Sequence, residues 1–92
     1  MVTESGLWIK DEIDDKILIV KSNYVKGNFL SKTIINEFSS NFELLRTIQS
    51  EKVDIKKNDW VIYSPEITEN NITKKKEGFV ILSTNFNENI IN

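Results

Sequence analysis

The sequence contains no cysteine and no histidine. Without cysteine, the chain can form no disulfide, thiol nucleophile, cysteine–zinc site or iron–sulfur cluster. Without histidine, it lacks the commonest general base and the commonest transition-metal ligand, which excludes serine–histidine catalysis. Only three glycines and one proline occur in 92 residues, and no glycine-rich phosphate-binding motif is present. We therefore expect a protein that is not an enzyme and that uses no cofactor.

The chain also lacks an excess of charge of either sign. The 12 basic and 14 acidic residues leave a net charge of −2, and Arg46 is the sole arginine. Nucleic-acid backbones are bound by broad basic surfaces, which this balance does not provide. The densest basic run, Lys74-Lys75-Lys76, is typical of a solvated loop between strands. We expect no nucleic-acid partner.

No hydrophobic run approaches the roughly 20 residues that a membrane-spanning helix requires. With 39% hydrophobic and 28% charged residues, the composition is that of an ordinary globular domain. We expect one domain over residues 1–92. Such a composition suits a free-standing protein, and it equally suits an extramembrane domain excised from a larger membrane protein.

The densest acidic cluster is formed by Asp11, Glu12, Asp14 and Asp15. A calcium-binding loop would need spaced oxygen ligands, a central glycine and a terminal glutamate. The cluster has no such glycine and is short, so it is better interpreted as the tip of a β-hairpin. We expect no metal site.

Apolar, β-branched runs separated by turn residues predict strands near residues 7–12, 16–22, 60–67 and 78–84. Asp14-Asp15 and Gly27-Asn28 are typical of turns. Pro65 should limit the strand in which it lies. We expect residues 68–76 to form a polar loop and residues 85–92 to form a strand end or a tail.

The middle of the chain is ambiguous by pattern alone. Ile35, Phe38, Phe42, Leu45 and Ile48 recur every three or four residues, as they would on one face of a helix. Against a helix, a Ser-Ser-Asn cluster at residues 39–41 is typical of a turn. The β-branched residues at 33–35 favour a strand. The residues alone leave both structures open.

An ordered set of short motifs resembles a known family. The set comprises Gly6-Leu7-Trp8-Ile9-Lys10, Ile17-Leu18-Ile19-Val20, Phe29-Leu30, Thr33 to Phe38, Ile48 to Ile55 and Asn58 to Ile62. This succession resembles the periplasmic domain of the LptF/LptG lipopolysaccharide-export permeases, and its Gly-Leu-Trp opening is more similar to LptG. The chain departs from the family in lacking the transmembrane helices, and in carrying the large Val53 where the family favours small residues.

The resemblance implies an all-β fold, an open β-jellyroll in which residues 29–38 and 43–55 are both strands. It implies a periplasmic domain of an inner-membrane ABC transporter that has an ATPase subunit. Such a domain passes the acyl chains of lipopolysaccharide through an apolar groove to a neighbouring Lpt jellyroll, with which it pairs by strand edges. No metal or cofactor is implied.

Alternation along the strands, where it exists, selects the apolar interior. We expect the lipid groove to be lined by Ile19, Leu30, Phe38, Ile48, Trp60, Ile62 and Ile81. A one-residue register shift would exchange the two faces of a strand, and we expect a β-bulge between Ser50 and Val53. Both tryptophans, Trp8 and Trp60, begin apolar runs, so we expect both in the core.

A second hypothesis belongs to a different class of protein. A small acidic chain without catalytic residues also suits a free-standing protein-binding inhibitor or a toxin-immunity protein. That protein would carry a helix over about Thr33 to Lys52, packed on a sheet. The presence or absence of this helix separates the two hypotheses.

Overall fold

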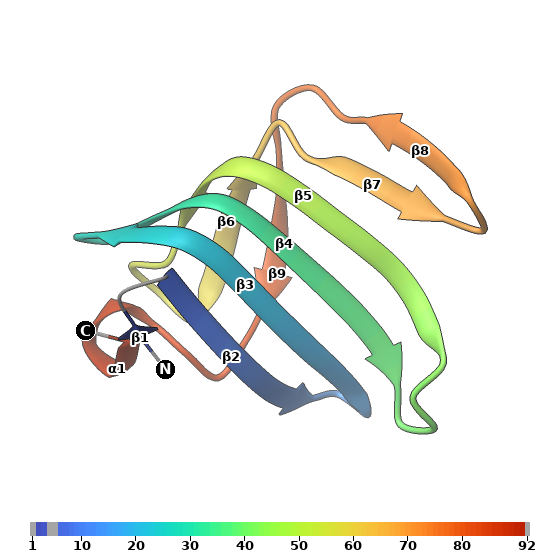
Figure 1. Cartoon of the computed structure of the whole chain (residues 1–92), viewed down its shortest axis with the longest axis horizontal. Coiled ribbons are helices and arrows are strands. Elements are labelled where there is room, and N and C mark those ends of the chain that lie inside the picture. Colours follow the sequence, from blue (N-terminus) through green and yellow to red (C-terminus); the bar gives the residue numbers. More distant parts are fainter. Residues whose placement is uncertain (1, 4–5, 92) are drawn as a thin grey trace.

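The computed structural model describes residues 2–3 and 6–91, and most of them lie in a single antiparallel sheet (Figure 1). The strands are β1 (Val2–Thr3), β2 (Gly6–Ile13), β3 (Lys16–Lys26), β4 (Phe29–Ser39), β5 (Leu44–Asp54), β6 (Asp59–Tyr63), β7 (Glu66–Glu69), β8 (Ile72–Lys75) and β9 (Phe79–Ser83). One short helix, α1 (Glu88–Ile91), follows the last strand. The predicted all-β class is confirmed.

The main path of the sheet runs β1-β2-β3-β4-β5-β6-β9 and does not close into a barrel. β5 has two partners on one edge, because β6 pairs with its last residues and β7 pairs with Thr47 to Gln49. The β7–β8 hairpin therefore leaves the main path and projects beside β5 (Figure 1). The expected open, folded sheet is confirmed.

Strands occupy the region that the sequence left ambiguous. β4 and β5 are paired along their length, with Ile35 opposite Ile48 and Thr33 opposite Ser50. The turn between them begins at Ser39, whose hydroxyl accepts a hydrogen bond from the amide of Glu43 at 3.2 Å. The helix over Thr33 to Lys52 that the second hypothesis required is not formed.

Two-residue turns connect several strands, and their side chains tolerate positive φ. Asp14 and Asp15 have φ of 52° and 59°, and Asn70 and Asn71 have φ of 50° and 63°. Paired positive φ values match the right-handed twist of the strands that such turns join. The first turn was predicted. The second corrects the expected loop over residues 68–76: residues 66–75 form the β7–β8 hairpin, in which Ile67 and Ile72 are the only apolar residues, so the strand signal is weak.

Ser64 and Pro65 divide the segment predicted as one strand over residues 60–67. Ser64 has a φ of 45°, and proline can donate no ladder hydrogen bond. The chain therefore leaves β6, turns, and rejoins β5 as β7. The prediction that Pro65 limits its strand is confirmed, and the two-strand outcome corrects the predicted boundary.

A bend crosses β3, β4 and β5 at one level. On β5, Ser50 and Val53 are both buried although only two residues lie between them, so the strict alternation of faces breaks there. The pairs on either side, Thr33–Ser50 and Ser31–Lys52, keep the same register. The predicted β-bulge between Ser50 and Val53 is therefore wrong: the register holds there because the neighbouring strands break their alternation at the same level. The register shift between β4 and β5 lies instead between Glu37 and Phe38.

Buried hydroxyl groups satisfy the backbone at this bend. The Ser50 hydroxyl contacts the carbonyl oxygens of Lys52 at 2.9 Å and Tyr63 at 2.6 Å. Two strands away, on β3, the Ser22 hydroxyl lies 2.8 Å from the Ser31 carbonyl oxygen. A buried carbonyl without a partner is costly. These hydroxyls therefore allow the sheet to fold without leaving carbonyl oxygens unpaired.

Candidate functional site

The fold encloses one apolar interior. Beyond the bend, β6 and β9 pack on the inward face of the earlier strands, so that distant parts of the chain share one core (Figure 1). The buried members are Leu7, Ile9, Leu18, Val20, Leu30, Ile35, Ile48, Val53, Ile55, Trp60, Ile62 and Leu82. Burial of this apolar area is the main source of stability. The interior is filled by its own side chains.

The predicted groove residues separate into two groups. Leu30, Ile48, Trp60 and Ile62 are buried in the interior. The other three, Ile19, Phe38 and Ile81, lie on the outward face, and their placement in the interior was wrong. Ile19 pairs with Lys10 and Asn36, Phe38 with Ile17 and Leu44, and Ile81 is 53% exposed.

These errors share one physical cause. Runs such as Ile17-Leu18-Ile19-Val20 and Phe79-Val80-Ile81-Leu82 are apolar on both faces, so alternation cannot choose between them. In the structure, Val20 and Leu82 are buried, and their neighbours Ile19 and Ile81 point outward. Whether the inward residues contact lipid is a separate question.

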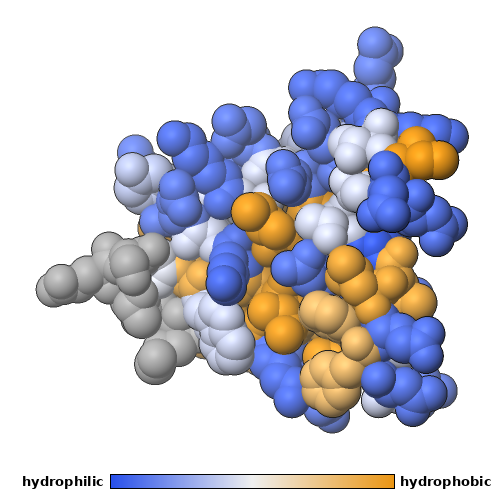
Figure 2. Space-filling model, turned by 45° about the vertical axis from the view of Figure 1, so that its right-hand side comes forward, coloured by the Kyte–Doolittle hydropathy of each residue, from blue (hydrophilic) through white to orange (hydrophobic). Residues whose placement is uncertain are grey.

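Trp8 is a further correction, because its side chain is 47% exposed while Leu7 and Ile9 on either side are buried. It is one of several exposed apolar residues on the outward face, which lie near the start of β2, in the middle of β4 and around the start of β5. The exposed members are Trp8, Ile34, Phe42, Leu44 and Leu45. Figure 2 shows apolar side chains gathered across the centre and lower part of one face of the molecule. The apolar residues of this surface are visible in the sequence, but the sequence does not show that they face outward.

An aromatic group occupies the outward face beyond the bend. Tyr24, Lys52, Tyr63 and Phe79 lie in one row across neighbouring strands. The Lys52 ammonium lies 4.6 Å from the centre of the Phe29 ring and 5.4 Å from that of Tyr63. Cations are attracted to the faces of aromatic rings. Lys52 therefore stabilises an exposed aromatic surface.

The folded sheet is open between β2, near one end of the main path, and β9, at the other end, and we call this gap the seam. Residues 84–91, which we call the strap, cross it from the end of β9 (Figure 1). One Asp11 carboxylate oxygen accepts a hydrogen bond from the Asn85 amide at 2.8 Å, and the other accepts one from the Asn85 side chain at 2.9 Å. The Asn85 side chain also donates to the Glu12 carbonyl at 2.9 Å.

The strap also packs on the interior. The Trp60 indole donates a hydrogen bond to the Phe86 carbonyl at 2.8 Å, and the Glu88 amide donates to the Ile55 carbonyl at 2.7 Å. The side chains of Phe86 and Ile91 pack against the core while remaining partly accessible. The strap therefore covers one side of the interior without a continuous β-ladder to β2.

One buried ionic cluster lies on the inward face. The Glu37 carboxylate is 2% exposed, accepts a hydrogen bond from the Arg46 guanidinium, and lies 2.9 Å from the Lys16 ammonium. Burial raises the pKa of Glu37, but the hydrogen bonds and charges of Arg46 and Lys16 outweigh burial, so that the pKa lies below its ordinary value of 4.5. Glu37 is therefore ionised at neutral pH.

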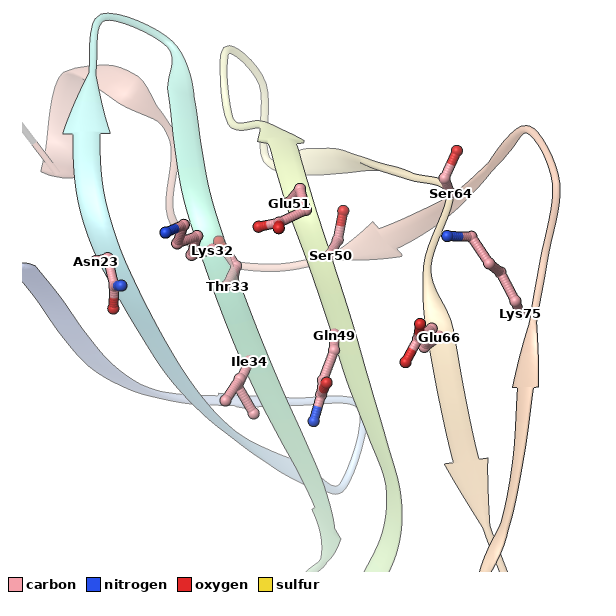
Figure 3. Close-up of a pocket in the computed structure, with 10 residues that line it drawn as sticks. All are labelled: Asn23, Lys32, Thr33, Ile34, Gln49, Ser50, Glu51, Ser64, Glu66 and Lys75. Atoms are coloured by element: carbon pink, nitrogen blue, oxygen red, sulfur yellow. The ribbon is translucent and has the colours of Figure 1, made fainter.

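A polar cleft of about 490 Å³ lies on the outward side, beside the bend (Figure 3). Lys32 of β4 and Glu51 of β5 line one part, and Glu66 of β7 and Lys75 of β8 line the part beside the hairpin. Two positive and two negative side chains give the cleft no dominant charge. Its lining is unsuited to an acyl chain.

Neither a protein-family model nor a curated protein matches this chain. Among residues 2–3 and 6–91, no three carboxylate, imidazole or thiol groups gather as they would around a metal ion. Over the same part of the chain, no helix has the length and hydropathy needed to cross a bilayer. A function for the interior and its seam must therefore be argued from their geometry alone.

Proposed function

We propose that this chain is the periplasmic lipid-conduit domain of an LptF/LptG-type lipopolysaccharide-export permease, in which the apolar interior carries acyl chains toward a neighbouring jellyroll. The observation that carries the proposal is an antiparallel sheet folded around an apolar interior with an unclosed seam. A closed barrel would have no seam for a lipid chain to enter by, and a flat sheet would enclose no interior.

Acyl chains can be bound by burial alone. Removing apolar area from water contributes about 25 cal/mol per Å² and requires no titrating group. The interior side chains near the seam, such as Leu7, Ile9 and Leu82, are of the type that this interaction needs. The bound chains would replace contacts that the interior side chains now make with one another and with the strap.

Handover to a neighbour requires an available strand edge, and the edges differ. β8 carries two lysines, which discourage pairing with another chain. β9, with the sequence Phe79 to Ser83, has no charged residue and no proline, and within the described residues it pairs with β6 alone. An edge of this kind accepts an added strand through backbone hydrogen bonds. In the proposal, β9 supports strand-edge pairing with a neighbouring jellyroll.

A photo-crosslinking experiment in the parent permease tests the conduit. A crosslinking amino acid at Ile62 or Ile48 should capture lipopolysaccharide during ATP-driven transport, because both side chains face the interior. The same amino acid at Ile81, on the outward face, is the matched control. Capture from position 81 together with none from 48 and 62 would overturn the proposal.

A further inference from the structure

The interior is filled by its own side chains, so the proposed function requires that space for an acyl chain be made. Leu30 and Ile62 are completely buried, so an acyl chain cannot occupy the interior as it stands. Space must be made by moving an element of the fold. The element that moves should be one whose hydrogen bonds can break without separating two strands of the sheet.

The central strands are poor candidates for that movement. β4 is paired with both β3 and β5 along almost its full length, through ten and nine register pairs respectively. Separating β4 from either neighbour would break a continuous backbone ladder and expose the core on both sides of the break. These strands are the rigid frame of the interior.

The strap is held differently. Its contact with β2 consists of the Asn85 backbone amide and side chain on the Asp11 carboxylate and the Glu12 carbonyl. Its other bonds go to residues 55–60: Glu88 to Ile55, Thr84 and Asn87 to Asn58, and the Trp60 indole to Phe86. None of these bonds belongs to a ladder between two strands, so breaking them leaves the sheet paired. Asp11 is a buried acidic residue at the seam, on the same strand as Leu7 and Ile9. When the strap leaves, water can solvate this carboxylate, so opening at the seam does not strand a charge in an apolar environment.

The strap also covers part of the interior that an acyl chain would use. Phe86 and Ile91 pack on the core from this segment. Their displacement would expose apolar side chains beside Trp60, and an acyl chain lying there could restore the lost burial. Strap and acyl chain are therefore alternative occupants of the same side of the interior.

We infer that the strap, residues 84–91, is a displaceable cover of the interior, and that the Asp11–Asn85 contact is the latch that opens before an acyl chain enters. The inference rests on the proposed function for the identity of the occupant. The strap's ability to open by itself is a separate property of this chain and can be measured without lipid.

Native-state hydrogen exchange tests the strap. The Glu88 amide is bonded to Ile55, and it should exchange at least tenfold faster than the slowest amides of the β3–β4–β5 ladders, through an opening that depends weakly on denaturant. Asn85→Ala should accelerate Glu88 exchange by about ten- to a hundredfold, because bonds to a buried carboxylate are lost. Asn89→Ala, an exposed change of the same kind in the same segment, should leave the rate unaltered. Equal protection of Glu88 and the central ladders would overturn the inference, as would an unaltered rate in Asn85→Ala.

A disulfide tests the coupling to lipid. Because the chain has no cysteine, Asp11→Cys with Asn85→Cys gives one reversible cross-link across the seam. The pair Lys10→Cys with Ile19→Cys joins register partners that are already paired, and serves as the control. With cis-parinaric acid as an acyl-chain probe, oxidation should weaken binding at least tenfold in the seam pair and leave it unchanged in the control.

The outcomes separate the inference from the proposed function. Equal binding by the oxidised and reduced seam pair would overturn the strap's role while leaving the lipid interior supported. Absence of binding in both redox states and in the unmodified chain would overturn the proposed function and the occupant that it supplies. In that case, the exchange experiment still decides whether the strap opens.

Discussion

The inward and outward faces of the folded sheet both carry large apolar side chains, yet they differ in what lies against them. Inward residues such as Ile35 and Ile62 are buried because β6 and β9 fold back over the earlier strands. Outward residues such as Ile34 and Ile81 remain exposed, although each is the immediate sequence neighbour of a buried residue, Ile35 and Leu82 respectively. The amino-acid type therefore does not distinguish the core from the surface here. The bend makes the distinction, because it lets β6 and β9 cover one face of the earlier strands and leaves the other face exposed.

The largest effect is expected when the same substitution, isoleucine to alanine, is made once on each face. Ile62→Ala should lower the free energy of unfolding by about 2–5 kcal/mol, because it removes buried methylene groups and leaves a cavity. Ile81→Ala, on the outward face, should cost less than about 1 kcal/mol. Urea denaturation measures both values. Comparable losses in the two variants would show that the outward face is covered in solution.

Glu37 tests whether the charge on the inward face stabilises the fold. Glu37→Gln should cost about 1–3 kcal/mol, a reduced value for a buried ion pair because Lys16 and Arg46 are partly exposed. The lowered pKa of Glu37 gives a sign for pH: its contribution is fully present above the ordinary value of 4.5 and is lost as the pH falls through the lower folded-state pKa.

Unfolding curves between neutral and acidic pH measure this difference. The unmodified chain should lose more stability than Glu37→Gln as the solution is acidified, so the two curves should converge. A gap that stays constant down to the most acidic conditions at which both chains remain folded would contradict the role assigned to the carboxylate.

The bend is tested by the hydroxyl group that supports it. Ser50→Ala removes the partner of the Lys52 and Tyr63 carbonyl oxygens, and should cost about 1–2 kcal/mol. Ser40→Ala, in the exposed turn after β4, is the matched control and should change stability by less than about 0.5 kcal/mol. Thermal unfolding of both variants provides the measurement, and an unchanged Ser50→Ala midpoint would mean that water replaces the hydroxyl at no cost.

The smallest effect is expected on the outward face. Lys52→Gln removes the cation from the rings of Phe29 and Tyr63 and should cost about 0.5–1 kcal/mol. Lys57→Gln, at an exposed position in the turn after β5, should cost less. Chemical denaturation at low and moderate salt compares them. If both lysine variants were equally stable, the aromatic row would derive no support from Lys52.

The sequence determined which segments would be strands wherever local signals agreed. β-branched runs with short turns predicted β2, β3, β6 and β9, and the Asp14-Asp15 turn followed from the tolerance of aspartate for positive φ. The strand character of β4 and β5 was not decided by pattern. It followed from the family resemblance, because helical spacing and turn residues gave opposing indications there.

Only the tertiary structure decided which face of each strand is inside. In Ile17-Leu18-Ile19-Val20, every position satisfies a hydrophobic pattern, so the inward set depends on strands that are distant in the sequence. The bend adds to this, because three strands change their inward parity together. The latch between Asp11 and Asn85 joins residues separated by almost the whole chain. Local propensity acts over a few residues, whereas burial and closure depend on the complete path of the sheet.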